Sequence, residues 1–87
     1  MDLEKLRSEI ALIDRKVMKL VSERTLLAGR IGEIKHSEGL PIKDPEVETR
    51  VVARYRDCAA ESGLEPEEGE RLARLLIDIA IRKETQR

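Results

Sequence analysis

Two cations on one face of a predicted helix could bind an anion. Arg24 occupies a position in an apolar repeat that would otherwise hold an aliphatic residue, and an unpaired cation there costs free energy. Lys35 follows eleven residues later, which at about 3.6 residues per turn is almost the same face. Leu27, Ala28 and Ile31 lie between the two cations on that face. The spacing predicts one wall of a pocket for a small anion with an apolar body.

The same two cations also have an ordinary structural explanation. Long basic side chains can cross an apolar surface and place their charge in solvent. This alternative applies more readily to Lys35, close to the end of the predicted helix, than to Arg24 in its middle. The sequence contains no Ser-His-Asp set, metal-ligand cluster or phosphate-binding loop, and His36 borders a predicted loop. We therefore expect a site without a nucleophile or a metal.

Three acidic residues could complete the pocket, and each of them has an alternative reading. Asp44 and Glu48 are four residues apart at the start of the second predicted helix. Asp44 also fits a helix N-cap, and Glu48 could be an ordinary surface acid. Glu84 follows an apolar track on the third predicted helix, where composition alone favours an exposed C-terminal charge.

A third cation, Arg7, lies near the start of the first predicted helix. It is about 25 Å from Arg24 along the helix axis. One small ligand cannot contact both residues within one chain, but an antiparallel partner could bring a second Arg7 close to Arg24.

The elements that must position these residues are three predicted helices, one long and two short, which gives an all-α fold. Apolar residues at alternating spacings of three and four predict the first helix from about 3 to 36. Gly39 and Pro41 mark the connection that follows. The second helix should begin at Asp44-Pro45 and end near Gly63, and the third should begin at Glu65-Pro66. Leu72, Leu75 and Leu76 belong to the predicted core stripe of the third helix.

The length of the first helix predicts a dimer. It should span roughly 50 Å, whereas a compact globule of this chain length would be only about 30 Å across. The helix therefore overhangs any monomeric globule, and a second chain is expected to cover its apolar seam.

Composition excludes several classes of function. The 87 residues include 17 basic and 18 acidic residues, for a net charge of −1, and no Trp or Phe. A nucleic-acid-binding surface is therefore not expected. No apolar run is long enough for a membrane span, and the N-terminus has no signal-peptide character. The lone cysteine, Cys58, fits a reducing cytoplasm, and its place in an apolar run favours a buried thiol.

Residues at fixed offsets across the chain form a specific combination. They are Leu6-Arg7-x-x-Ile10-x-x-Ile13-Asp14, Glu23-Arg24, Ile34-Lys35 and Pro41-Ile42-x-Asp44-Pro45-Glu46-x-Glu48. Together they resemble the all-helical AroQ-type chorismate mutases over nearly the whole chain. The resemblance implies a single domain over 1–87 and an intertwined homodimer whose active sites take residues from both chains. It also implies the rearrangement of chorismate to prephenate, toward phenylalanine and tyrosine, without a cofactor.

The resemblance further implies a role for each charged residue. Arg24 would pair with one substrate carboxylate, and Arg7 of the partner subunit with the other. Lys35 would reach a carboxylate and the ether oxygen that gains negative charge. Asp44 and Glu48 would receive the ring hydroxyl, with Glu48 favoured because Asp44 also caps a helix.

The remaining implied positions include apolar walls and three departures from the family pattern. The walls would be formed by Ile31, Val51, Ile77 and Ile81. Glu84 stands where the family has a glutamine, or in some fungal members a glutamate, facing the ether oxygen. Val47 stands where many relatives have an arginine that helps hold a carboxylate, which Arg50 or Lys43 could replace. Ala80 replaces a small polar residue.

Two other functions are compatible with the same fold. An isochorismate-pyruvate lyase uses this scaffold but generally lacks the acidic pair that Asp44 and Glu48 form here. A non-catalytic helical dimer that regulates another shikimate-pathway enzyme would not need Arg7, Arg24 and Lys35. The acidic pair favours the mutase over the lyase. The retained cations and Glu48 favour it over the regulatory dimer, which Val47 and Ala80 leave open.

Overall fold

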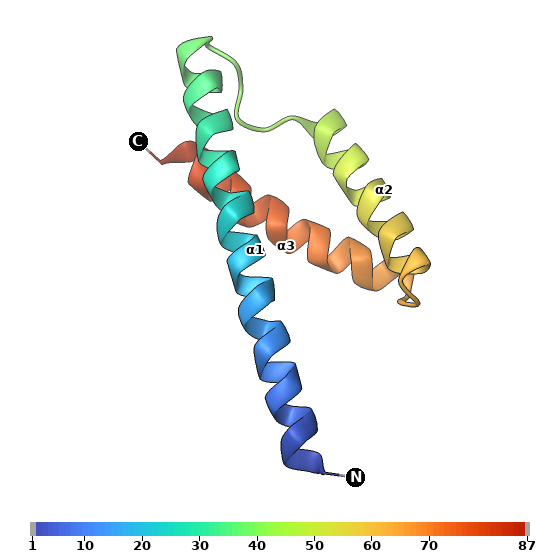
Figure 1. Cartoon of the computed structure of the whole chain (residues 1–87). Coiled ribbons are helices and arrows are strands. Elements are labelled where there is room, and N and C mark those ends of the chain that lie inside the picture. Colours follow the sequence, from blue (N-terminus) through green and yellow to red (C-terminus); the bar gives the residue numbers. More distant parts are fainter. Residues whose placement is uncertain (1, 87) are drawn as a thin grey trace.

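The computed structural model describes residues 2–86 as three helices. They are α1 (Leu3–Ser37), α2 (Pro45–Glu61) and α3 (Pro66–Thr85). In Figure 1, α3 crosses the C-terminal half of α1, and α2 lies beside α3. No strand occurs within residues 2–86, so the predicted all-α architecture of one long and two short helices is confirmed. Over the same residues, no helix is long and apolar enough to cross a membrane.

Local signals explain where α2 begins and ends. Asp44 Oδ1 accepts hydrogen bonds from the backbone N–H groups of Glu46 and Val47, at 3.2 and 3.3 Å. These are donors that the first turn of a helix leaves unpaired. Pro45 occupies the first helical turn, where its missing N–H is not needed. Gly63 follows the helix with a φ of 79°, a left-handed conformation that glycine adopts without strain.

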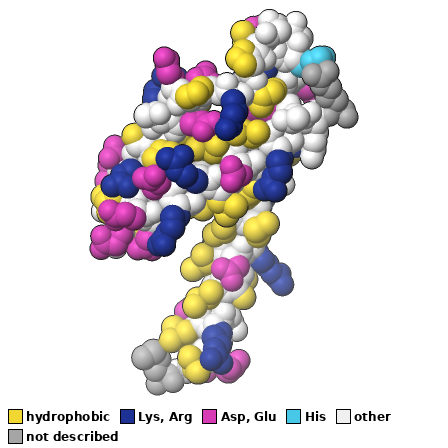
Figure 2. Space-filling model, turned by 180° about the vertical axis from the view of Figure 1, so that it is seen from behind, with side chains coloured by type: hydrophobic (Ala, Val, Ile, Leu, Met, Phe, Trp, Pro, Cys, Tyr) yellow, Lys and Arg dark blue, Asp and Glu magenta, His cyan; other side chains and the backbone are white. Residues whose placement is uncertain are grey.

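The N-terminal half of α1 projects away from the other two helices. We call residues 3–20 of α1 the N-terminal arm. Every residue from 2 to 20 is exposed in the single chain, and Figure 2 shows hydrophobic side chains along this projection. The molecule measures 57 × 26 × 14 Å. Its radius of gyration is 16.0 Å, compared with about 12 Å for a compact domain of this length.

A small core forms where α3 packs against α2 and against α1. Val51 of α2 packs against Ala73 and Ile77 of α3. Ala28 and Gly32 of α1 are buried where α1 meets α3. Within the described residues, α1 and α2 do not pack directly on each other. This arrangement leaves a space between α1 and α2 that α3 closes from one side.

Two core predictions are wrong for the single chain. Cys58 is exposed rather than buried, because α3 covers the side of α2 that carries Val51 and Ala59. Leu72 and Leu75 are 48% and 54% exposed, although the apolar stripe of α3 was expected to be core. Periodicity identified these positions as apolar, but within residues 2–86 no element covers them.

Candidate active site

A cavity of about 330 Å³ lies where the three helices meet. We call it the central cavity, and it contains every predicted site residue except Arg7. The residues from α1 are Arg24, Ile31 and Lys35. Those from α2 and its N-cap are Asp44, Glu48 and Val51, and those from α3 are Ile77, Ile81 and Glu84. The fold thus brings together residues that are up to 60 positions apart in the sequence.

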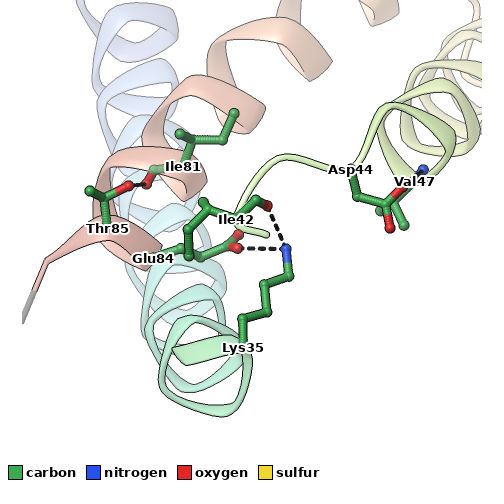
Figure 3. Close-up of polar contacts among 7 residues, drawn as sticks. All are labelled: Lys35, Ile42, Asp44, Val47, Ile81, Glu84 and Thr85. Carbon is green, nitrogen blue, oxygen red and sulfur yellow. Dashed lines mark hydrogen bonds and ion pairs between the residues drawn. The ribbon is translucent and has the colours of Figure 1, made fainter. Parts of the chain in front are cut away.

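Lys35 is held inside the protein by two oxygen atoms. Its Nζ donates to the Ile42 carbonyl oxygen at 2.6 Å and to Glu84 Oε1 at 2.9 Å (Figure 3). The side chains of Lys35 and Glu84 are only 20% and 10% exposed. The ammonium group therefore does not extend into solvent. An ammonium has three N–H donors, so one donor remains after these two contacts.

Arg24 is positioned by the backbone of α3. Its Nη1 donates to the Leu76 carbonyl oxygen at 3.3 Å, and this contact is partly buried. The guanidinium has five N–H donors in a planar arrangement, and a single contact leaves most of them available. Arg24 therefore combines a fixed position with unused donors, as binding a carboxylate requires.

Asp44, the N-cap of α2, and Glu48 of α2 differ in the number of hydrogen bonds that their carboxylate oxygens already accept. Asp44 Oδ1 caps α2 through two backbone N–H groups. Glu48 is half-buried and forms no ion pair within residues 2–86. Glu48 therefore has the larger capacity to accept a hydrogen bond from a ligand hydroxyl.

Arg7 does not line the central cavity of its own chain. It lies on the N-terminal arm with its side chain 65% exposed and pairs with Glu4 at 3.3 Å. This pair is between neighbouring turns of one helix, and such exposed pairs contribute little stability. Arg7 is therefore available to another molecule.

Sequence reasoning missed two contributors to the cavity. Ile42 supplies a carbonyl oxygen to Lys35, which a side-chain pattern cannot reveal. Arg54 lines the cavity three residues after Val51 on α2, and helical spacing could have identified it. Arg50 and Lys43, named above as candidates to replace the arginine that many relatives have at position 47, do not line the cavity.

The chemistry available in the cavity is binding and electrostatic stabilisation. Fixed cations face apolar walls and acidic acceptors, which suits an anionic ligand that also carries a hydroxyl group. Within residues 2–86 no group of three or more His, Cys, Asp and Glu side chains is arranged to hold a metal ion.

Comparison with known proteins identifies the family. Residues 6–85 match the family model of chorismate mutase type II. The chain belongs to this family. As a chorismate mutase type II member it is 37% identical to the chorismate mutase of Methanocaldococcus jannaschii, over 87% of this chain and 77% of that protein. The family predicted from the sequence is therefore confirmed.

Other relatives of this chorismate mutase family member are much longer proteins. It is 48% identical to the bifunctional chorismate mutase/prephenate dehydratase of Aquifex aeolicus, over 58% of this chain and 14% of that protein. It is 39% identical to the T-protein of Haemophilus influenzae, over 71% of this chain and 16% of that protein. The chain thus spans less than a fifth of either relative.

Proposed function

We propose that this chain is a chorismate mutase that converts chorismate to prephenate. The observation that carries the proposal is the central cavity of a type II family member, in which Arg24 and Lys35 are fixed against apolar walls. The named relatives include a chorismate mutase and a bifunctional chorismate mutase/prephenate dehydratase. These names favour the mutase over the lyase and over a non-catalytic regulatory dimer.

The reaction is unimolecular, so the protein must mainly select a conformation and stabilise charge. Chorismate carries two carboxylates, and binding both in fixed positions would hold the compact, chair-like conformer that reacts. Arg24 would bind one carboxylate through its unused N–H groups. The ring hydroxyl would donate to Glu48, with Asp44 beside it. Apolar walls would exclude water, which strengthens each of these charged contacts.

Lys35 is the proposed source of transition-state stabilisation. As the ether bond breaks, negative charge grows on its oxygen atom, and a fixed donor at that oxygen lowers the barrier. Two of the three Lys35 donors are used by Ile42 and Glu84. The third would point to the ether oxygen. Because the ammonium group is already fixed, little reorganisation is needed at the moment of reaction.

Arg7 does not line the cavity of its own chain, and we propose that a homodimer brings it to the second carboxylate. The chain exposes 7135 Å², whereas a monomeric globule of this mass exposes roughly 5,200 Å². Large apolar residues are exposed along the N-terminal arm. A second arm packed antiparallel would cover this surface and bring Arg7 of the partner subunit to the cavity.

The cellular location proposed for this enzyme is the cytoplasm. Cys58 is a free and exposed thiol. Such a thiol is compatible with a reducing compartment, where disulfides are rare.

An assay of chorismate consumption with identification of the product tests the proposed function. We expect prephenate from the wild type. We expect Arg24→Ala to lose about 2–5 kcal/mol of transition-state stabilisation in kcat/KM, because a charge-assisted contact disappears. Arg30→Ala is the matched control, since Arg30 is an exposed residue of the same helix outside the cavity. Formation of pyruvate from isochorismate would support the lyase instead, and a wild type inactive on both substrates would support the regulatory dimer.

A further inference from the structure

Arg54 shares a helix face with the ligand-facing residues of α2. Val47, Val51 and Arg54 follow one another at spacings of four and three, and all three line the central cavity. These spacings keep side chains on one side of a helix. Val51 is buried, whereas Arg54 is exposed. Arg54 therefore lies at the rim of the cavity.

The charge of the cavity lining depends on Arg54. The charged lining side chains are three cations and three carboxylates: Arg24, Lys35, Arg54, Asp44, Glu48 and Glu84. Without Arg54 the carboxylates would outnumber the cations around a ligand that is itself a dianion. Like charges at such close range oppose binding. Arg54 brings the lining to balance before any partner chain contributes.

The guanidinium of Arg54 is not committed to another charged group. Within residues 2–86 it forms no ion pair. It lies over the ring of Tyr55, with its Cζ atom 6.0 Å from the ring centroid. An arginine over an aromatic face keeps its in-plane N–H donors available. Arg56, two residues later, differs because it pairs with Glu67 and Glu70.

We infer that Arg54 is a further substrate-binding residue, which pairs with a ligand carboxylate at the rim of the central cavity. The inference rests on the proposed function, because it takes the dianionic substrate from there. In this chain Val47 leaves the first turn of the α2 face without a cation. Arg54 supplies the positive charge two turns further along the same face.

The effect of Arg54 should appear in KM rather than in kcat. A carboxylate keeps its charge throughout the rearrangement, so a contact with it is equally strong in the ground state and in the transition state. Removing such a contact weakens binding without changing the barrier from the bound state. This pattern distinguishes Arg54 from Lys35, whose proposed contact strengthens as the ether bond breaks.

Four proteins test the inference: the wild type, Arg54→Ala, Arg50→Ala and the double variant Arg54→Ala/Val47→Arg. We expect Arg54→Ala to raise KM for chorismate about tenfold, as for loss of one hydrogen bond to a charged group, with kcat within about twofold. Arg50→Ala is the matched control, because Arg50 is an exposed arginine of α2 outside the cavity lining. Val47→Arg should lower the KM of Arg54→Ala again by returning a cation to the same face.

Calorimetric binding of prephenate provides a readout that does not depend on turnover. The inference is supported if Arg54→Ala binds prephenate more weakly than the wild type, by about the same factor as its KM rises, and if Arg50→Ala binds prephenate like the wild type. If Arg54→Ala binds prephenate and chorismate like the wild type while the wild type is active, the inference is overturned and the proposed function stands. If the wild type neither turns over chorismate nor binds prephenate, the proposed function fails and the inference fails with it. Circular dichroism melting should be unchanged in Arg54→Ala, since the side chain is exposed.

Discussion

At the residue scale, Glu84 presents a conflict between what it does without ligand and what the reaction would require. In the structure it accepts a hydrogen bond from Lys35 Nζ at 2.9 Å. An ether oxygen that gains negative charge needs a donor, and an ionised carboxylate can only accept. Glu84 can therefore assist the reaction only in its protonated form.

This conflict predicts the effect of a single substitution. Glu84→Gln replaces a carboxylate that only accepts hydrogen bonds with an amide of similar size whose N–H group can donate to the ether oxygen. We therefore expect kcat/KM of Glu84→Gln to be at least as high as that of the wild type. The measurement is kcat/KM of both proteins. A much lower value for Glu84→Gln would mean that Glu84 acts only by holding Lys35 and that Lys35 alone serves the ether oxygen.

Some of the site residues could be predicted from the sequence, and others could not. Arg24, Lys35 and Glu48 are side chains at helical spacings, so periodicity and family resemblance placed them at the cavity. The Ile42 carbonyl could not be predicted, because a backbone atom in a connection has no sequence pattern. Arg54 was within reach of helical spacing, but its relevance depends on how α2 is placed against α1, which three-dimensional packing decides.

At the scale of elements, the crossing of α1 and α3 depends on a glycine. A Cβ added to Gly32 would lie 2.6 Å from both Cα and the carbonyl oxygen of Glu84. No side-chain motion can relieve a contact with backbone atoms. The close approach of the two helices at Gly32 therefore fixes the position of Glu84 relative to Lys35, one turn later on α1.

We predict that Gly32→Ala destabilises the fold and reduces activity, whereas Gly29→Ala does not. The Gly32 variant must move α3 away from α1, at a cost of about 1–3 kcal/mol in the free energy of unfolding. At Gly29 the nearest atom is the flexible Lys83 Cε at 3.1 Å, and alanine favours the helix by about 0.5–1 kcal/mol. Urea unfolding and kcat/KM of both variants test this. Equal stability of the two variants would contradict the role assigned to Gly32.

The ends of the helices were the easiest features to predict, because the residues that begin and end a helix act within a few positions of it. Asp44, Pro45 and Gly63 mark the ends of α2 through contacts within a few residues. Which element buries each apolar face was harder to predict, as the exposed Leu72 and Leu75 show. An apolar stripe indicates that something will bury it, but the sequence does not indicate whether that partner belongs to the same chain.

At the scale of the whole molecule, the exposed apolar surface of the N-terminal arm leads to a prediction about assembly. A chain with no large side chain fully buried among the described residues has little core of its own. We expect analytical ultracentrifugation at micromolar concentration to report roughly twice the 9.9 kDa chain mass. A stably folded monomer under those conditions would contradict both the dimer and the shared site.

A mixing experiment tests whether Arg7 and Arg24 serve one site from two chains. Arg7→Ala and Arg24→Ala should each be weakly active alone, because every site in either homodimer lacks one cation. In a hybrid dimer one of the two sites has both arginines, so mixing should recover part of the activity. The measurement is chorismate turnover before and after subunit exchange. Confirmed exchange without recovered activity would show that Arg7 does not act across the interface.

The N-terminal arm also couples folding to protein concentration. If the arm acquires its apolar cover only from a second chain, folding and association become one bimolecular process, and the unfolding midpoint rises with chain concentration by mass action. Dilution alone would then unfold this protein, as heat or urea unfolds a monomer. At a lower chain concentration a smaller fraction of the chains would be folded dimers, so the number of active sites would fall faster than the number of chains. The expression level in the cell would therefore set the activity per chain as well as the total activity.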